Sequence, residues 1–259
     1  MLSTQGIYFS IGKKEILKNI SIDFLPGEFN MILGPNGSGK STFLKIFSGE
    51  LKPSKGNVFV DGKQLPEIKN EDLAKIRAVM TQQPELSFPL SVEEVVMMGR
   101  YPHFDFHPAK KDETICIEAI EKMQIEHLKG RNYLTLSGGE KQRVQFARVL
   151  AQIWIRPEIG NCYLFLDEPL ANLDINYQQA FLKLAKELVQ YNTVLIAVMH
   201  DINLAVQYAD KLFFLKAGEL VASGSPLEIL SETLIKQVFD VEVKIITNPL
   251  DGTPLMVYV

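Results

Sequence analysis

The sequence predicts an α/β fold with a mainly parallel sheet, an N-terminal antiparallel β-lobe and an inserted helical subdomain. Three observations lead to it: two continuous apolar runs at 162–166 and 194–199, an alternation of polar and apolar residues over 7–24, and helical periodicity from about 90 to 135. A chain of 259 residues is long enough for a full α/β core with a smaller helical lobe. We therefore expect a single domain over 1–259.

The N-terminal elements are expected to form the β-lobe and lead into the core. Turn signals at Gly12-Lys13-Lys14 divide the first alternating segment into two antiparallel strands. An apolar strand at 29–33 then enters a glycine-rich turn, which is followed by a helix-like run at 42–47. Residues 57–62 provide a further β-like piece. Strand, loop and helix in this order are the setting that a phosphate-binding loop needs.

The remaining elements complete the core and define the subdomain. Pro102 and Pro108 interrupt the helical periodicity, as proline does inside helices. The two later apolar runs are short, rich in bulky or β-branched residues and followed by polar residues, which is typical of buried parallel strands. The tail at 241–259 alternates around a turn and predicts a terminal hairpin. We place the core with its β-lobe at about 1–85 and 160–259, and the helical subdomain at about 86–159.

Composition and charge exclude several classes of protein. Hydrophobic residues make up 46% and charged residues 22%, as in a folded globular protein, and the formal charge of −4 argues against nucleic acid as a partner. Cys116 and Cys162 lack metal-ligand spacing and are expected to be reduced and buried. The N-terminus lacks the features of a signal peptide, and no apolar run reaches the length of a membrane span. Any membrane role is expected to depend on a partner.

A phosphate-binding loop is the strongest motif. The pattern GxxxxGK[ST] is filled by Gly34, Pro35, Asn36, Gly37, Ser38, Gly39, Lys40 and Ser41, and Thr42 follows it. The glycines let backbone N–H groups surround phosphates at a helix N-terminus, while Lys40 reaches the β- and γ-phosphates and Ser41 the magnesium ion. The alternative, a glycine-rich turn beside an unrelated lysine, does not explain the strand before it and the helix after it.

Two acidic residues follow the apolar strand at 163–166. Asp167 and Glu168 are expected at the carboxyl edge of the sheet, where α/β proteins bind ligands. Asp167 is suited to hold Mg²⁺ through its water shell and Glu168 to polarise an attacking water, because phosphoryl transfer depends mainly on positioning. The alternative is a pair of helix-capping acids.

A second anion site is indicated at the start of another helix. Ser137, Gly138, Gly139 and Glu140 precede a helical run, so the serine and the glycine amides can face an anion. The same residues could instead form only a well-capped helix.

The phosphate loop, the segment LSGGEKQR at 136–143 and the segment LFLDEP at 164–169, in this order, resemble the nucleotide-binding subunit of ABC transporters. The resemblance covers nearly the whole chain. It implies a P-loop NTPase core, an ATPase activity with ATP and Mg²⁺, and two copies facing head to tail. Ser137, Gly138 and Gly139 of one copy then close over the γ-phosphate held by the other.

The resemblance also assigns residues outside these motifs. Gln82 corresponds to the glutamine that senses magnesium and the γ-phosphate, although Gln83 is adjacent and the register could differ by one. His200 follows a strand at the position of the switch histidine. Asp174 corresponds to the aspartate that contacts the opposite site, but it could equally cap the next helix.

The residue that stacks on adenine is left open. Ile11 stands where the family often has an aromatic residue, and Tyr8 or Phe9 could substitute for it. The other histidines, His103, His107 and His127, lack metal-ligand spacing and are expected to be surface groups.

The segment at 86–103 looks like importers of haem, ferric siderophores and cobalamin, and within that group it is most similar to haem-import ATPases. Segments 151–154 and 238–243 support the haem branch. The resemblance implies a homodimer of ATPase subunits at the cytoplasmic face of the membrane, bound to integral-membrane permease subunits and, through them, to a substrate-binding protein. Siderophore or cobalamin import, and a soluble ABC ATPase without a transport role, remain as alternatives. A nucleotide-binding regulator without hydrolysis ranks last because Glu168 is present.

Overall fold

The computed structural model describes residues 1–81, 86–155, 160–190 and 192–259. The strands within these ranges are β1 (Leu2–Ile11), β2 (Lys14–Ile20), β3 (Asp23–Phe24), β4 (Phe29–Leu33), β5 (Lys55–Val60), β6 (Lys63–Gln64), β7 (Arg77–Met80), β8 (Cys162–Asp167), β9 (Thr193–Val198), β10 (Lys211–Lys216), β11 (Glu219–Gly224), β12 (Val243–Thr247) and β13 (Pro254–Tyr258). The α-helices are α1 (Lys40–Phe47), α2 (Asn70–Ile76), α3 (Val92–Met97), α4 (Lys110–Lys122), α5 (Gly138–Gln152), α6 (Ile175–Val189), α7 (Ile202–Tyr208), α8 (Pro226–Ile229) and α9 (Glu232–Phe239). Short 3₁₀ helices are η1 (Leu65–Glu67), η2 (Met98–His103), η3 (Glu126–Leu128) and η4 (Tyr133–Thr135).

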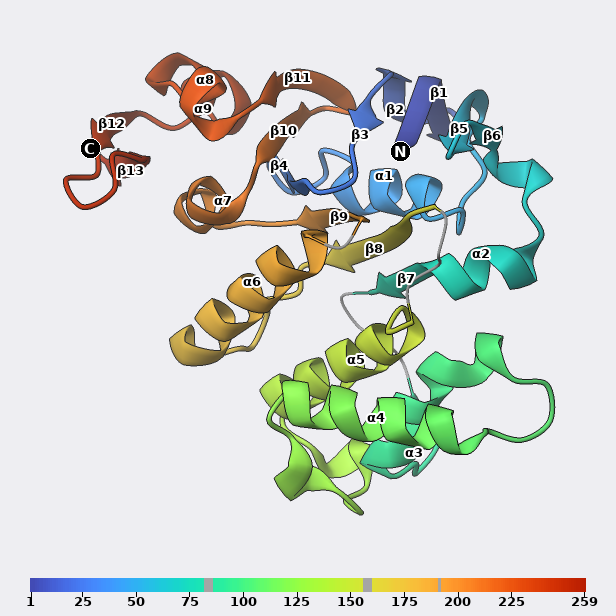
Figure 1. The fold of residues 1–259 in the computed structure, drawn as a ribbon. Helices are drawn as coiled ribbons and strands as arrows, with labels where there is room; N and C mark the ends of the chain where they lie inside the picture. Colours follow the sequence, from blue (N-terminus) through green and yellow to red (C-terminus); the bar gives the residue numbers. More distant parts are fainter. Residues whose placement is uncertain (82–85, 156–159, 191) are drawn as a thin grey trace.

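The central layer is a six-stranded sheet in the order β11-β10-β4-β9-β8-β7 (Figure 1). All neighbouring strands run parallel except β10 and β11, which form an antiparallel pair. Every residue of β4, β8 and β9 is buried, as expected for parallel strands covered on both faces. The predicted α/β fold is confirmed, and the carboxyl ends of these three strands meet at one edge of the sheet.

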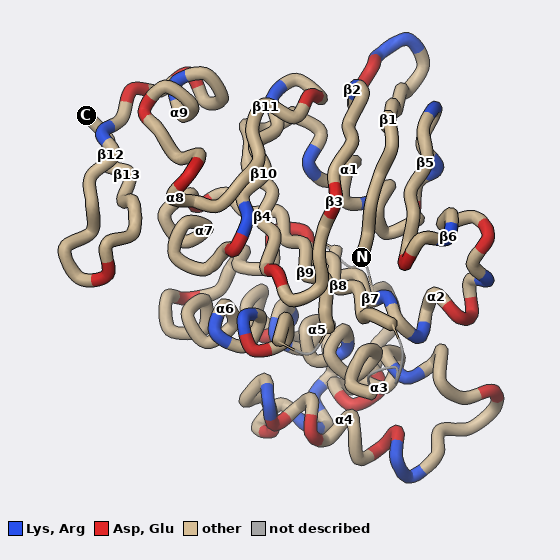
Figure 2. The backbone as a smooth tube through the Cα atoms, turned by 45° about the horizontal axis from the view of Figure 1, so that its top comes forward, with Lys and Arg blue, Asp and Glu red and all other residues tan. Residues whose placement is uncertain are grey.

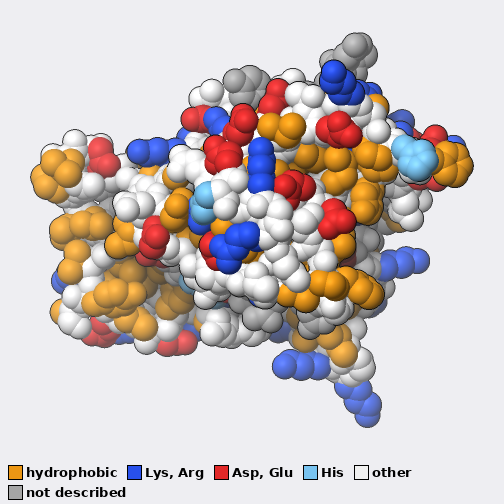
Figure 3. Space-filling view, turned by 90° about the horizontal axis from the view of Figure 1, so that it is seen from below, with side chains coloured by type: hydrophobic (Ala, Val, Ile, Leu, Met, Phe, Trp, Pro, Cys, Tyr) orange, Lys and Arg blue, Asp and Glu red, His pale blue; other side chains and the backbone are white. Residues whose placement is uncertain are grey.

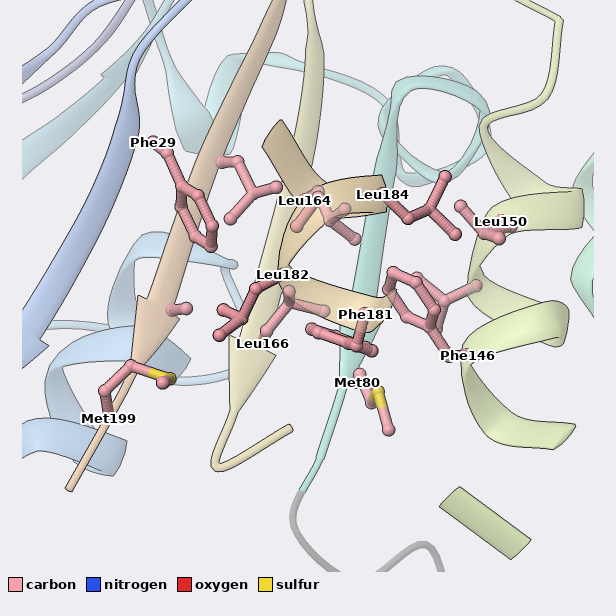
Figure 4. Packing of buried hydrophobic residues seen from close by; sticks show 14 of the residues in the cluster. Phe29, Met80, Phe146, Leu150, Leu164, Leu166, Phe181, Leu182, Leu184 and Met199 are labelled. Atoms are coloured by element: carbon pink, nitrogen blue, oxygen red, sulfur yellow. The ribbon is translucent and has the colours of Figure 1, made fainter. Parts of the chain in front are cut away.

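The two faces of the sheet carry two hydrophobic clusters because side chains alternate along each strand. Tyr163 and Phe165 of β8 point towards the β-lobe and α1, where they join the cluster that contains Phe43. Leu164 and Leu166 point to the other face and pack with residues of α5 and α6 such as Phe146 and Phe181 (Figure 4). The sheet is thus held between α1 with the β-lobe on one side and the helices on the other.

The N-terminal β-lobe is confirmed. Strand β1 pairs antiparallel with β2, β3 and β5, and its hairpin with β2 turns at Gly12 and Lys13. Phe24 of β3 contacts Phe47 of α1, with ring centroids 5.2 Å apart, so the lobe is fastened to the helix that follows the phosphate loop. This contact fixes the position of α1 between the lobe and the sheet.

The helical region consists of α3, η2, α4 and α5, which lie together below the sheet in Figure 1. Pro102 lies inside η2 and Pro108 precedes α4, so both prolines fall between the longer helices. A buried ion pair joins these elements, with Arg100 Nε 2.9 Å from Asp112 Oδ1 and both side chains fully enclosed. Arg100 Nη1 also donates to the carbonyl of Ala151 at the end of α5.

The prediction that His103 is a surface group was wrong. His107 and His127 are exposed, but His103 is half-buried, and its Nε2 lies 2.7 Å from the carbonyl oxygen of Gln152. Burial lowers the pKa of His103, and the hydrogen bond to Gln152 opposes this effect. The difference arises because η2 folds back against the C-terminal end of α5, whose carbonyls attract hydrogen-bond donors.

The C-terminal region forms a separate layer beside β10 and β11. The predicted terminal hairpin is confirmed as β12 paired with β13. Both cysteines are buried, as predicted. Lys and Arg residues are interspersed with Asp and Glu along the backbone (Figure 2). No helix among the described residues is both long and apolar enough to cross a membrane.

Candidate nucleotide site

The phosphate loop connects β4 to α1 and ends at a left-handed residue. Gly39 caps α1 with φ of 102°, a conformation that glycine adopts without strain. A Cβ at this position would also lie 2.8 Å from Cδ2 of Leu17. The first N–H groups of a helix have no partner within it, and the first turn of α1 contains no acidic residue. The backbone N–H groups at the start of α1 therefore carry a partial positive charge, which favours binding of an anion.

The start of the loop is pressed against strand β10. A Cβ on Gly34 would collide with the carbonyl oxygen of Leu215 and would lie 2.8 Å from Oγ of Ser38. Among the described residues Ser38 Oγ is buried and makes no hydrogen bond. A buried hydroxyl without a partner is costly, so this group is suited to a ligand held in the loop.

Lys40 folds back into the loop. Its Nζ donates to the carbonyl oxygens of Gly34 at 2.8 Å and Pro35 at 3.1 Å. Burial lowers the pKa of Lys40, while the nearby carboxylates of Glu168 and Asp167 act to raise it. An anionic phosphate in the loop would compensate for the desolvation of the ammonium group.

Asp167 and Ser41 form the candidate metal site. Ser41 Oγ donates to Asp167 Oδ1 at 3.1 Å, which joins the first turn of α1 to the end of β8. Burial raises the pKa of Asp167, the hydrogen bond from Ser41 opposes the shift, and the neighbouring Glu168 adds to it. A carboxylate and a hydroxyl oxygen are the ligand types that Mg²⁺ uses together with nucleotide phosphates. These residues fit the predicted ion.

Glu168 and His200 meet at the same sheet edge. Oε1 of Glu168 lies 2.6 Å from Nε2 of His200, so the ends of β8 and β9 bring together two predicted catalytic residues. Glu168 has φ of 51°, which is uncommon for a residue other than glycine.

These residues surround one cleft of about 580 Å³. Its described lining consists of Lys14, Ile16, Asn36, Gly37, Gly39, Lys40, Ser41, Thr42, Glu168 and His200. The structure thus gathers most of the predicted phosphate loop with Glu168 and His200. Asp167 is linked to the cleft by its hydrogen bond to the lining residue Ser41. Lys14 and Ile16 were not predicted as site residues, although Lys14 is part of the predicted turn and Ile16 lies two residues after it.

The described cleft lining contains no Phe, Tyr or Trp. Tyr8 lies beside Lys55, whose Nζ is 5.8 Å from the ring centroid, and Phe9 packs against the core of the β-lobe. Ile11 is 65% exposed at the end of β1. Neither Tyr8 nor Phe9 lines the cleft, whereas Ile16 does.

The second predicted anion site lies apart from this cleft. Oγ of Ser137 accepts a hydrogen bond from the backbone N–H of Glu140, and Asp174 Oδ1 accepts one from the N–H of Tyr177. Ser137 and Asp174 are therefore helix caps within the chain, which was the structural alternative for each. Gly138 and Gly139 form the first turn of the same helix as Ser137. Gln82 lies outside the described residues.

The fold and the cleft define a nucleotide-binding protein of the phosphate-loop class. The family model described as ABC transporter matches residues 17–171. The chain belongs to the ABC transporter family, as an ATP-binding subunit.

Relatives of similar length share its sequence throughout. It is 42% identical over 257 residues to the hemin import ATP-binding protein HmuV of Gloeobacter violaceus, covering 99% of this chain and 94% of that protein. It is 39% identical over 260 residues to the protein of the same name from Escherichia coli O157:H7, covering 99% of each.

Solved structures agree with the fold. A metal-chelate type ABC transporter in an inward-facing conformation superposes with a TM-score of 0.82 at 24% identity, covering 100% of this chain and 96% of that one. The dimeric structure of the bacterial ABC transporter cassette MJ0796 gives a TM-score of 0.76 at 27% identity, covering 87% and 98%. A further structure of MJ0796 contains ADP and Pi after hydrolysis.

Proposed function

We propose that this protein hydrolyses MgATP to drive import of hemin through a membrane ABC transporter. The observation that carries the ATPase part is the Glu168–His200 pair, which lies in one cleft with the phosphate loop. The similarity to hemin import proteins along 99% of the chain supports hemin as the transported molecule.

The phosphate loop is proposed to bind the triphosphate. Backbone N–H groups from Asn36 to Thr42 surround the phosphates, and Lys40 exchanges its carbonyl contacts for the β- and γ-phosphates. Ser41 and Asp167 hold Mg²⁺, with Gln82 proposed as a further ligand. The ion neutralises charge on the phosphates when it is bound.

Glu168 is proposed to act as general base. Its carboxylate accepts a proton from the water that attacks the γ-phosphorus, while His200 hydrogen-bonds the γ-phosphate and steadies that water. The 2.6 Å contact of the two side chains keeps both at the same end of the cleft.

A second copy is proposed to complete each site. Ser137, Gly138 and Gly139 lie outside the cleft of their own chain, at the N-terminus of a 15-residue helix. In a head-to-tail dimer these residues close over the γ-phosphate of the other copy, and Asp174 contacts the opposite site. ATP favours the closed dimer because it makes more contacts there than with one chain.

The helical region is proposed to dock a permease subunit. Phe88, Tyr101 and Phe106 are 70%, 58% and 89% exposed. Figure 3 views the molecule from the side on which this region lies and shows hydrophobic patches between charges of both signs.

We propose that residues 1–259 form one cassette with about 86–159 as its subdomain. The cassette would be bound to the cytoplasmic face of the membrane, and the permease would contact a substrate-binding protein.

The test is reconstitution with the membrane subunits that copurify with the chain. We expect ATPase activity that rises when hemin and its binding protein are added. A stable membrane complex that responds only to a ferric siderophore or cobalamin would redirect the cargo. ATPase activity without any membrane partner would favour a soluble role.

A further inference from the structure

Three hydrogen bonds between described residues hold the backbone around Glu168. Its N–H donates to the carbonyl of Val198 at 3.2 Å, and its carbonyl accepts from the N–H of Ala171 at 3.2 Å. The third donor is Gln142, whose Nε2 lies 3.4 Å from the oxygen of Glu168 and 3.0 Å from that of Pro169. Of these three contacts, the one from Gln142 is made by a side chain.

Gln142 reaches this turn from a different element. It lies on α5, one turn beyond the cap Ser137, and its side chain is 7% exposed. A buried amide is retained where its hydrogen bonds are satisfied, and this one donates to two consecutive carbonyls of the turn. The turn needs such support, because Glu168 has φ of 51° and precedes a proline, which restricts it further.

The other end of the loop after β8 also contacts the start of α5. A Cβ on Gly139 would lie 2.8 Å from the carbonyl oxygen of Asn172, and one on Gly138 would lie 3.3 Å from Cβ of Asn172. Glycine is needed here for close packing within one chain. The loop at 168–172 therefore rests on the first two turns of α5 at both of its ends.

We infer that Gln142 is a positioning residue for hydrolysis, acting by fixing the backbone of Glu168. The inference rests on the proposed role of Glu168. Because Gln142 bonds to carbonyls of the turn and does not line the described cleft, its loss should misplace the carboxylate without removing a contact to ATP.

The test is Gln142→Met, which keeps the length of the side chain and removes its donors. We expect kcat for ATP to fall about 10- to 100-fold, as for a small displacement of a catalytic group. The Kd for ATP, measured in EDTA to prevent turnover, should stay within about twofold of wild type, since no phosphate contact is lost.

A matched control is Gln152→Met. Gln152 lies on the same helix, and its Nε2 also donates to two backbone carbonyls, those of Ala74 and Arg77. We expect this variant to lose as much thermal stability as Gln142→Met but to keep kcat. Gln142→Glu is a second variant with nearly native shape, and its kcat should fall as well.

Wild-type kcat in Gln142→Met or Gln142→Glu, or an equal loss of kcat in Gln152→Met, would overturn the inference. A wild-type protein that does not hydrolyse ATP would instead contradict the proposed function itself.

Discussion

At the scale of single residues, two adjacent carboxylates at the end of β8 have different surroundings. Asp167 is buried and bonded to Ser41, whereas Glu168 turns towards His200 in the cleft. Different surroundings allow neighbouring acids to take different parts in one reaction. The structure thus supports separate roles for a metal-binding and a proton-accepting carboxylate.

We expect the ionised carboxylate of Asp167 to lower the stability of the nucleotide-free protein. Its pKa is raised by burial, so the folded state disfavours the ionised form. Asp167→Asn should therefore raise the melting temperature of the nucleotide-free protein at neutral pH and weaken Mg²⁺-dependent nucleotide binding. Thermal unfolding and nucleotide titrations with and without Mg²⁺ measure the two effects.

The sign of the pH dependence follows from the same shift. The destabilisation by ionised Asp167 is complete above the pKa of the folded state and is relieved as the pH falls through that pKa. The increase in melting temperature caused by Asp167→Asn should therefore vanish below the ordinary pKa of 3.8. Asp105→Asn, at an exposed position, is the control. A lower melting temperature for Asp167→Asn at neutral pH would contradict this account.

Residues whose role follows from motif chemistry could be predicted from the sequence, and contacts between distant segments could not. Lys40, Ser41 and Asp167 belong to patterns whose spacing follows from phosphate and metal chemistry. Ile16 belongs to no such pattern. Gln142 lies in the LSGGEKQR segment, but the pattern of that segment does not specify what its side chain contacts. Their contacts arise from the tertiary packing of distant segments.

At the scale of elements, α5 connects the turn after β8 to several other segments of the chain. Its side chains donate to the turn after β8 through Gln142, to the carbonyl of Val79 through Arg148, and to carbonyls of Ala74 and Arg77 through Gln152. Its last carbonyls accept from Arg100 and His103. Of these side-chain contacts, the ones from Gln142 are made to the turn that contains Glu168.

The buried Arg100–Asp112 pair fixes the C-terminal end of α5 against α4. Arg100→Met should lower the free energy of unfolding by about 3–5 kcal/mol, because it leaves Asp112 buried without its partner. Adding Asp112→Asn should recover part of the loss, since the amide needs no counter-charge. Chemical denaturation measures both.

The control breaks an exposed pair. Lys122 and Glu187 lie 3.1 Å apart with side chains 47% and 58% exposed, so Lys122→Met should cost less than about 1 kcal/mol. Equal losses for Lys122→Met and Arg100→Met would show that burial does not determine the effect.

The strands were easier to predict than the helices. Apolar runs such as 162–166 and 194–199 are continuous and lie in fully buried strands. In the helical region, the helical periodicity and the proline breaks could be predicted from the sequence, but the contact of His103 with the end of α5 could not. That contact depends on how η2 folds back, which local sequence does not specify.

At the scale of the whole molecule, the predicted functional residues fall into two groups. The phosphate loop, Asp167, Glu168 and His200 lie at one edge of the sheet, while Ser137 and Asp174 cap helices away from that cleft. Sequence resemblance predicts that two copies bring the groups together. Residue spacing alone could not, because the predicted contact is between chains.

The most direct test is the mass of Glu168→Gln in solution, measured by light scattering with and without MgATP. We expect this variant to hydrolyse ATP slowly, to retain ATP and to show twice the monomer mass when MgATP is present. Adding Lys40→Ala should abolish the ATP-dependent dimer, because nucleotide binding itself is weakened. A Glu168→Gln variant that hydrolyses ATP at the wild-type rate and stays monomeric would contradict both the general base and the shared site.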